Sequence, residues 1–311
     1  MAISYERNML EMLAMPARQE VKNAIIKTLF RHNGSIKEFA VGEAIVTEIA
    51  DLFSLNKDQR ETVLERIYRK ENRIVKTPLW HRLLYRAANE LAKENLVTKP
   101  TDTILLTNKK EWLLTEKGID RALELLNISF VQKETLPTQS FEIQKEVKRI
   151  KEKERPENYI PFETKRTANV SAKIINIRSR GFRKAVIETY NYTCCVCGLK
   201  INSPNNLYWE VEAAHIVPHN LNGKDDIWNG VALCRLHHWA FDVGWFSFSN
   251  KYRILLSSHL KNIPDDFGKI NGFEFFRNSL ELNKKILLPD GNSLRPHENA
   301  IEWHRENIFN P

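Results

Sequence analysis

The residues of this chain whose types and spacing could do chemistry are concentrated between Cys194 and His238. Two pairs of potential metal ligands occur there, Cys194 with Cys197 and Cys234 with His237, and two residues separate the members of each pair. Three thiolates and one imidazole in such pairs are typical of a tetrahedral structural zinc site. We therefore predict that these four residues bind zinc.

Three further polar residues, His215, Asn229 and His238, are interleaved with the predicted zinc ligands. A zinc site would hold them in a fixed geometry. A neutral histidine can accept a proton near neutral pH, and a second histidine can bind a cation. We interpret the three residues as a candidate active site.

The order and spacing of these motifs, from about residue 178 to 250, resemble the HNH nucleases of the ββα-metal fold. The resemblance implies a β-hairpin that carries His215, a loop that carries Asn229 and a short helix that carries His238. It also implies that His215 is the general base, that Asn229 fixes the loop, and that His238 binds a divalent cation, Mg²⁺ or Mn²⁺. Many members have Asp immediately before the first histidine, whereas this chain has Ala214.

Because Ala214 cannot bind a metal, other residues must complete the cation site. Asp242 is the best candidate, since it follows His238 by four residues and shares its helix face. Glu212 is a second candidate, because it shares a strand face with position 214. Arg235 is a candidate phosphate contact. The alternative for Asp242 is a helix cap or an internal ion pair.

Other residues of the motif have structural interpretations. His219 follows Pro218 and is expected to be a solvated loop residue. Cys195 has no partner in the scheme and is expected to be a buried thiol. His237 and His238 could exchange roles, but the Cys-x-x-His spacing favours His237 as the zinc ligand.

Composition is consistent with a nucleic-acid enzyme. The length of 311 residues suggests about two domains, and the net charge of +8 with a pI near 9.2 favours a polyanionic partner such as double-stranded DNA. Four cysteines could form two disulfides. Residues 1–20, however, contain charges and no apolar signal core, so zinc in a reducing prokaryotic cytoplasm is the better interpretation. No apolar run approaches the roughly 20 residues of a membrane span.

The N-terminal part has the pattern of a winged-helix domain, which we assign to residues 1–128. Amphipathic helices are expected at 18–30, 41–55 and 80–94. Two strands at 103–107 and 111–114, joined by a polar turn, would form the wing, and a helix at 119–126 would follow. This pattern resembles the N-terminal domain of Mrr-type restriction proteins. The expected fold class is therefore α+β, with a winged-helix domain joined by a charged linker to a zinc-supported ββα-metal domain.

The third helix of a winged-helix domain typically enters the major groove of DNA. Arg82 and Arg86 lie four residues apart on one face, and could contact a base edge and a phosphate. Trp80 and Tyr85 offer apolar surface for the methyl group of a base. The alternative is that Trp80 and Leu84 belong to the core and that the arginines are merely solvated.

Other basic residues are also candidate DNA contacts. In the wing these are Lys109 and Lys110, and in a helix that precedes the zinc motif they are Arg178, Arg180 and Arg183. Residues 129–170 have mixed charges and are expected to form a linker with a solvated helix, which Pro156 and Pro161 should end. Residues 171–311 would form the nuclease domain.

The sequence therefore predicts a restriction-type DNA endonuclease with a one-metal HNH mechanism. The resemblance of the winged-helix domain to Mrr-type restriction proteins favours cleavage that depends on 5-methyl- or hydroxymethylcytosine. Two alternatives remain open: a conventional type II restriction enzyme with a companion methyltransferase, and a winged-helix regulator whose zinc module no longer cuts. One active site per chain favours a homodimer for cutting both strands.

Overall fold

The computed structural model describes residues 5–32, 35–37, 43–68, 73–130, 133, 140–163, 172–204, 208–262, 272–281 and 284–311. The chain divides into two compact units, Met1–Gln144 and Lys145–Pro311. Each is described by itself. Among the described residues, no helix combines the length and the apolar composition that crossing a membrane requires.

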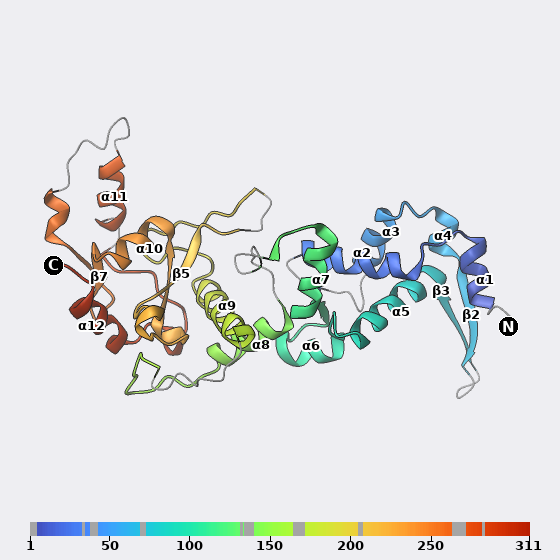
Figure 1. The fold of residues 1–311 in the computed structure, drawn as a ribbon, viewed down its shortest axis with the longest axis horizontal. Helices are drawn as coiled ribbons and strands as arrows, with labels where there is room; N and C mark the ends of the chain where they lie inside the picture. Colours follow the sequence, from blue (N-terminus) through green and yellow to red (C-terminus); the bar gives the residue numbers. More distant parts are fainter. Residues whose placement is uncertain are drawn as a thin grey trace. The chain divides into compact units, whose positions relative to one another are not determined.

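The first unit is mainly helical and contains two small antiparallel sheets (Figure 1). Its helices are α1 (Tyr5–Met12), α2 (Arg18–Arg31), α3 (Glu43–Leu52), α4 (Lys57–Glu61), α5 (Leu79–Lys93), α6 (Pro100–Thr107) and α7 (Glu116–Leu126). Strand β1 (Ser35–Lys37) pairs with β4 (Glu111–Leu113), and β2 (Val63–Tyr68) pairs with β3 (Arg73–Pro78). The three helices expected at 18–30, 41–55 and 80–94 are therefore present as α2, α3 and α5.

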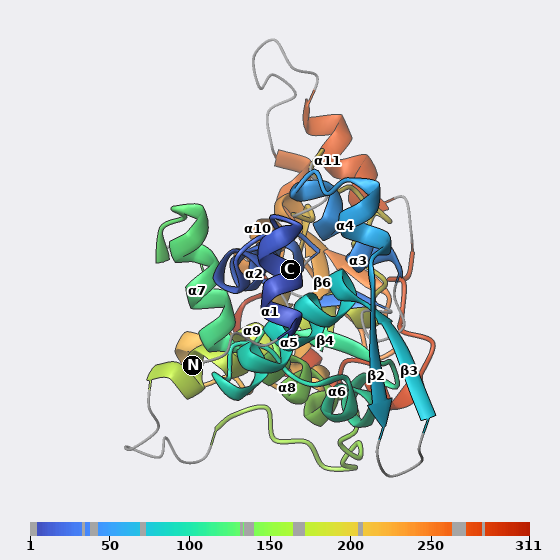
Figure 2. The same ribbon diagram turned by 90° about the vertical axis from the view of Figure 1, so that its right-hand side faces the viewer.

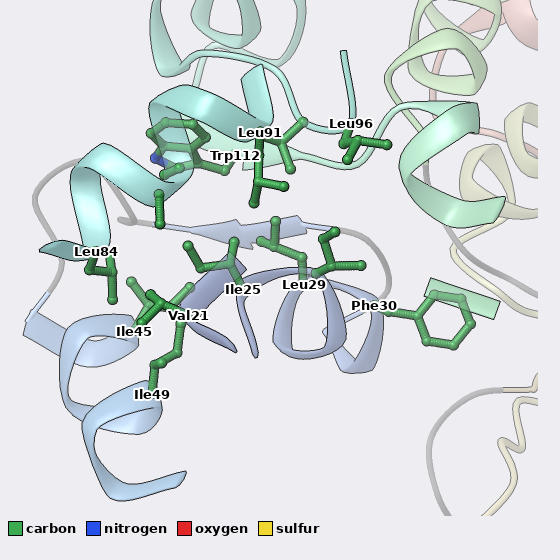
Figure 3. Packing of buried hydrophobic residues seen from close by; sticks show 14 of the residues in the cluster. Val21, Ile25, Leu29, Phe30, Ile45, Ile49, Leu84, Leu91, Leu96 and Trp112 are labelled. Carbon is green, nitrogen blue, oxygen red and sulfur yellow. The ribbon is translucent and has the colours of Figure 1, made fainter. Parts of the chain in front are cut away.

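The core of this unit lies between α2, α3 and α5 (Figure 3). Along α5 the apolar residues recur every three or four positions, which places them on one face of the helix. These residues are fully buried or nearly so: Trp80, Leu83, Leu84, Ala87, Ala88 and Leu91. Helix α2 contributes Val21, Ile25 and Leu29 to the same core. The opposite face of α5 carries its arginines.

The expected wing strand at 103–107 is wrong, because this segment is part of the helix α6. Pro100 occupies the first turn, where its fixed φ favours a helix, and Asn108 ends the helix in a left-handed conformation. The Thr103 hydroxyl donates a hydrogen bond of 2.6 Å to the carbonyl of Glu111, which ties α6 to β4. Strand β4 pairs with β1, and Val97 forms an isolated bridge with Leu114.

The antiparallel pair β2 and β3 was not expected from the sequence (Figure 2). It lies between α4 and α5, and its register runs from Val63 opposite Pro78 to Tyr68 opposite Arg73. Val63 and Ile74 are exposed, at 42% and 62%. The charged residues among these positions hide the alternating pattern that would have predicted strands.

The second unit contains the elements that carry the candidate site. Its helices are α8 (Phe141–Lys151, which begins at the end of the first unit), α9 (Ala172–Thr189), α10 (Arg235–Asp242), α11 (Gly272–Glu281) and α12 (Glu298–Asn307). Strand β5 (Val211–His215) pairs with β6 (Gly230–Cys234), and β7 (Phe246–Phe248) with β8 (Ile254–Leu256). Short 3₁₀ helices are η2 (His219–Leu221), η3 (Ile227–Asn229), η4 (Ser258–Asn262) and η5 (Asn292–Leu294).

Strands β5 and β6 with helix α10 form the ββα arrangement, and α9 packs against both strands (Figure 1). Gly230 permits this contact. A Cβ atom there would lie 2.4 Å from a methyl carbon of Val186 and 3.0 Å from the ring of Phe182. The start of β6 therefore approaches α9 too closely for a side chain.

Part of the segment that was expected to be a solvated linker is packed within the second unit. Ile150 and Tyr159 are buried, and Lys151 forms an ion pair of 2.7 Å with Glu188 of α9. Phe162 forms an isolated bridge with Gly223, in the loop between β5 and β6. Residues 145–163 thus belong to the second unit. The remainder of the expected linker falls largely outside the described residues.

Candidate active site and metal centre

The predicted zinc ligands converge from two turns of the chain. Cys194 and Cys197 lie in a tight turn after α9, which Gly198 closes with a φ of +77° and a hydrogen bond to the carbonyl of Cys194. Cys234 ends β6 and is the N-cap residue of α10, whose first turn contains His237. The ligand atoms of these four residues all lie within 4.8 Å of one another.

Chemistry and geometry of this Cys₃His cluster fit a structural zinc ion. Nδ1 of His237 lies 3.1 Å from Sγ of Cys234 and 3.6 Å from Sγ of Cys194. Hydrogen bonds from Cys197 and Cys234 lower the pKa of Cys194, which favours the thiolate that binds zinc. Cys195, in contrast, is fully buried, and burial raises the pKa of its thiol.

The far side of the His237 ring is also held. Nε2 of His237 lies 3.0 Å from the hydroxyl oxygen of Ser279 in α11, and that hydroxyl donates to the carbonyl of Phe276 at 2.7 Å. Ser279 therefore accepts a hydrogen bond from Nε2–H, which leaves Nδ1 as the ligand atom. Burial alone would lower the pKa of His237, but hydrogen bonds with Cys194 and Cys197 outweigh burial and raise it to about 9.

His215 lies at the end of β5 and has two defined neighbours. Its Nε2 atom is 2.9 Å from a carboxylate oxygen of Asp225, and both side chains are less than one fifth exposed, at 18% and 17%. The ring of Phe182 in α9 stacks on the imidazole with 4.0 Å between centroids. The exposed ring of His219 is 5.9 Å away. The imidazole is thus held at one nitrogen and on one face.

Asn229 is fully buried and fixes the loop between β5 and β6. Its side-chain oxygen accepts a hydrogen bond of 2.8 Å from the backbone N–H of Val217, and its amide donates to the carbonyls of Val217 and Lys224, each at 3.0 Å. Gly223 is required beside it, because a Cβ atom there would lie 1.9 Å from the carbonyl oxygen of Val217. Asn229 is thus placed to position the loop.

A second group of potential ligands, the carboxylate–histidine cluster of Glu212, His238 and Asp242, lies on β5 and α10. Nδ1 of His238 is 2.9 Å from Glu212, and Nε2 is 3.6 Å from Asp242. Arg235 donates a hydrogen bond of 3.2 Å to the other oxygen of Glu212. Ala214 is fully buried in β5 and contributes no ligand.

Electrostatics in this cluster favour a charged histidine. Burial alone would lower the pKa of His238, but the hydrogen bond with Glu212 and the charges of Asp242 and Glu212 raise it. The hydrogen bond from His238 lowers the pKa of Glu212, whereas burial raises the pKa of Asp242. Glu212 and Asp242 contact different ring nitrogens of His238, so a divalent cation could replace the proton on one nitrogen beside the carboxylate that faces it, and oxygen donors suit Mg²⁺ or Mn²⁺. The cluster is more open than the Cys₃His cluster, the one group of described residues whose donors all lie within 4.8 Å.

The structure does not present all the candidate DNA-reading residues of α5 at the surface. Trp80 is 1% exposed, and its ring N–H donates to the carbonyl of Val46, so its expected DNA contact is wrong and the core alternative holds. Arg82 and Arg86 both pair with Glu6 of α1, and Arg82 does so at 2.8 Å. Tyr85 is partly buried, and burial raises its pKa. Both arginines of α5 therefore form ion pairs within the first unit.

The other basic candidates differ in exposure. Lys109, Lys110 and Arg178 are exposed. Arg180 is only 5% exposed, so its expected phosphate contact is not supported by its position. Arg183 is half-buried and lies 3.3 Å from the Ser179 hydroxyl. Arg235 is 65% exposed at its side chain, beside the carboxylate–histidine cluster.

Asp225 and Ser279 were not found by sequence reasoning. Asp225 belongs to a pair of aspartates in a polar loop, and Asp226 instead pairs with Lys153. Ser279 lies 42 residues after His237. Neither residue has a fixed spacing to the histidine that it contacts, so only the fold reveals them.

Comparison with known proteins gives one family. Residues 194–249, which hold both clusters and Asp225, match the family described as HNH endonuclease. This part of the chain is therefore an HNH endonuclease domain, and it lies within an α+β protein. A solved structure titled "Modification dependent TagI restriction endonuclease" is similar at 20% identity and a TM-score of 0.31. The alignment covers 46% of this chain and 45% of that one, so this chain matches less than half of it. None of the curated proteins matches the chain.

Proposed function

We propose that this protein is a metal-dependent restriction endonuclease that hydrolyses phosphodiester bonds in double-stranded DNA. The observation that carries the proposal is the arrangement of the β5–β6–α10 unit. It places His215, with its carboxylate partner Asp225, on the same small fold as the carboxylate–histidine cluster. A candidate base and a candidate cation site on one rigid scaffold are what hydrolysis of a phosphodiester requires.

In this proposal His215 accepts a proton from the attacking water. The water oxygen forms the new bond to phosphorus, and the bond from phosphorus to the leaving oxygen breaks. His238 with Asp242, or alternatively with Glu212, would hold the cation, which would supply charge stabilisation at the phosphate and the leaving oxygen. Arg235 is positioned to exchange its hydrogen bond with Glu212 for one with a phosphate.

The DNA partner is supported by the net charge of +8 and by exposed basic side chains. Lys109, Lys110, Arg178 and Arg235 are the candidate contacts that remain accessible. Arg82 and Arg86 could contribute only after releasing Glu6, for which DNA phosphates would compete. A homodimer would bring two active sites to the two strands.

Modified cytosine is the proposed signal for cleavage. This part of the proposal extends the resemblance of the N-terminal pattern to Mrr-type proteins, although α6 replaces a strand of the expected wing. A conventional type II enzyme would cut unmodified DNA instead. A winged-helix regulator would bind DNA without cutting it.

The test is cleavage of one plasmid, prepared with and without cytosine methylation, by wild type and His215→Ala in Mg²⁺ or Mn²⁺. We expect cutting of the methylated plasmid only, and its loss in the variant. Cutting of unmethylated DNA alone would favour the type II enzyme. Cutting that survives in both His215→Ala and His238→Ala would overturn the assignment of the site, and DNA binding without any cutting would favour the regulator.

A further inference from the structure

The contact between Asp225 and His215 has a specific chemical consequence. A carboxylate can only accept a hydrogen bond, so the proton of a neutral His215 must lie on Nε2, the atom 2.9 Å from Asp225. The lone pair then lies on Nδ1. We propose that Asp225 is a positioning residue that sets this tautomer and thereby makes Nδ1 of His215 the proton acceptor. The proposal rests on the nuclease function proposed above.

The orientation of the His215 ring is defined by contacts on two sides. Phe182 stacks on one face, with planes 19° apart, so the ring cannot tilt freely. Stacking alone does not distinguish the two nitrogens, because a ring flipped by 180° would stack equally well. The hydrogen bond with Asp225 makes that distinction. Both side chains are less than one fifth exposed, which limits competition from water for this bond.

Asp225 is itself held by Asn229. The Asn229 side chain donates to the carbonyl of Lys224, and its backbone N–H donates to the carbonyl of Asp226, at 3.0 and 2.9 Å. Asp225 lies between these two anchored residues. Lys224 is also fixed by a backbone hydrogen bond to Pro161. Asn229 therefore anchors the residues on both sides of Asp225, and Asp225 contacts His215, which gives the buried asparagine a role in orienting the base.

The carboxylate would act again when the proton moves. As water gives its proton to Nδ1, His215 becomes a cation and Asp225 lies beside the new charge. The O–H bond of water breaks, the N–H bond forms, and the hydroxide oxygen attacks phosphorus. The leaving oxygen then takes a proton from solvent. Asp225 exchanges no proton in this sequence.

A purely structural role is the competing explanation, since an aspartate can stabilise a loop without affecting the base. The neighbouring residue Asp226 provides a matched control. It lies in the same loop, is only 7% exposed and pairs with Lys153 rather than with His215. Removing its charge tests the loop without touching the base.

The experiment compares Asp225→Asn, Asp225→Ala, His215→Ala, the double variant His215→Ala with Asp225→Ala, and Asp226→Asn. Asparagine has the shape of aspartate, but its amide can donate to Nε2 and so favour the proton on Nδ1, the wrong tautomer. We expect Asp225→Asn to lose on the order of 10²-fold or more in the single-turnover cleavage rate, at least as much as Asp225→Ala. DNA affinity and zinc content should be unchanged.

Three results bear directly on the proposal. The double variant should be no slower than His215→Ala, because Asp225 acts only through the base. A near-wild-type rate for Asp225→Asn, or multiplying effects in the double variant, would overturn the proposal. So would an equal loss in Asp226→Asn with retained zinc, because loop integrity would then explain the effect.

A measurement that needs no cleavage separates this inference from the proposed function. Long-range ¹H–¹⁵N NMR of protein labelled at histidine reports which imidazole nitrogen carries the proton, and the His215→Ala spectrum assigns the signal. We expect the Nε2–H form in wild type and its loss in Asp225→Asn. The other tautomer in wild type would refute the role of Asp225 even in a protein that cuts no DNA. A wild type that has the Nε2–H form and cuts nothing would refute the nuclease function alone.

Discussion

His237 and His238 are adjacent in the sequence and belong to two different clusters. Consecutive residues on a helix point about 100° apart, so one turn of α10 supplies a ligand to each side. His237 is 1% exposed and faces three cysteines, whereas the side chain of His238 is 25% exposed and faces two carboxylates. Burial and donor type therefore distinguish a closed cluster suited to structural zinc from a more open cluster that substrate and water could reach.

The two histidines also differ in how their second nitrogen is used. Nε2 of His237 donates to a neutral hydroxyl that donates onward to a backbone carbonyl, so the ring is fixed by a closed chain of hydrogen bonds. Both nitrogens of His238 face carboxylates that are themselves half-exposed. The first arrangement resists change. The second can exchange a proton for a cation without breaking the fold.

Removing a thiolate from the Cys₃His cluster should have the largest effect of the changes considered for the two clusters. Structural zinc can contribute on the order of 10 kcal/mol to the folding of such a site. We expect Cys194→Ser to lose zinc and to unfold the second unit, while residues 1–144 remain a protease-resistant fragment with their own core. Metal analysis and limited proteolysis measure this. A folded, zinc-free second unit would show that the cluster is dispensable.

His238→Ala tests the other side of α10. The expected result is a loss of cleavage on the order of 10²–10³-fold, because the proposed ligand of the charge-stabilising cation is removed. Zinc content and thermal stability should remain close to those of wild type, since His238 is outside the Cys₃His cluster. His259→Ala, at an exposed histidine, is the matched control. Loss of zinc in His238→Ala would mean that the two histidines exchange roles.

The residues of the Cys₃His cluster and the candidate ligands His238 and Asp242 could be picked out from the sequence because much of their spacing is local. Cys-x-x-His and the four-residue step from His238 to Asp242 are fixed by the geometry of a single helix turn. The contact of Asp225 with His215 depends instead on how the loop between β5 and β6 returns to the strand end. Aspartate and serine are common residues, so their presence in the sequence does not indicate a contact with a histidine. Only the fold shows that Asp225 contacts His215 and that Ser279 contacts His237.

The errors in the first unit have the same physical origin. The segment Thr103–Thr107 is rich in residues that favour strands, but the proline at the helix start and the bond from Thr103 to Glu111 select a helix. The spacing of apolar residues in α5 predicted both the helix and the face of it that is buried. It could not show that Glu6, 76 residues before Arg82, occupies the arginines.

A third histidine, His304, shows what burial does without a metal or an active site. Its Nε2–H donates to the carbonyl of Phe241 at 3.1 Å, and its Nδ1 accepts from the Ser247 hydroxyl at 2.9 Å, so the neutral ring is fully satisfied. Burial is the main cause that lowers the pKa of His304, to about 4. The unfolded chain, with a pKa near 6.5, binds the proton first.

Stability should therefore fall as the pH drops below about 6.5. The contribution of His304 is fully present above that pH, decreases by about 1 kcal/mol at pH 5.5 and by about 3 kcal/mol near pH 4. Urea unfolding of wild type and His304→Gln between pH 7.5 and 5.5 measures it, with zinc content followed in parallel. We expect a lower but flatter stability profile in the variant. Parallel profiles would show that His304 does not titrate differently on folding.

Ser279→Ala is the smallest change that tests the difference between the Cys₃His cluster and the carboxylate–histidine cluster. The variant removes the acceptor of Nε2–H of His237 and leaves all four ligands in place. Loss of such an outer hydrogen bond typically weakens metal affinity by about 10–100-fold. Competition with a zinc chelator measures this loss. Asn278→Ala, at an exposed position one residue earlier in α11, is the control for the helix.

Cleavage at saturating zinc should be unchanged, because Ser279 acts on His237 and not on the carboxylate–histidine cluster. A cleavage defect that persists in excess zinc would show that the two sides of α10 are coupled.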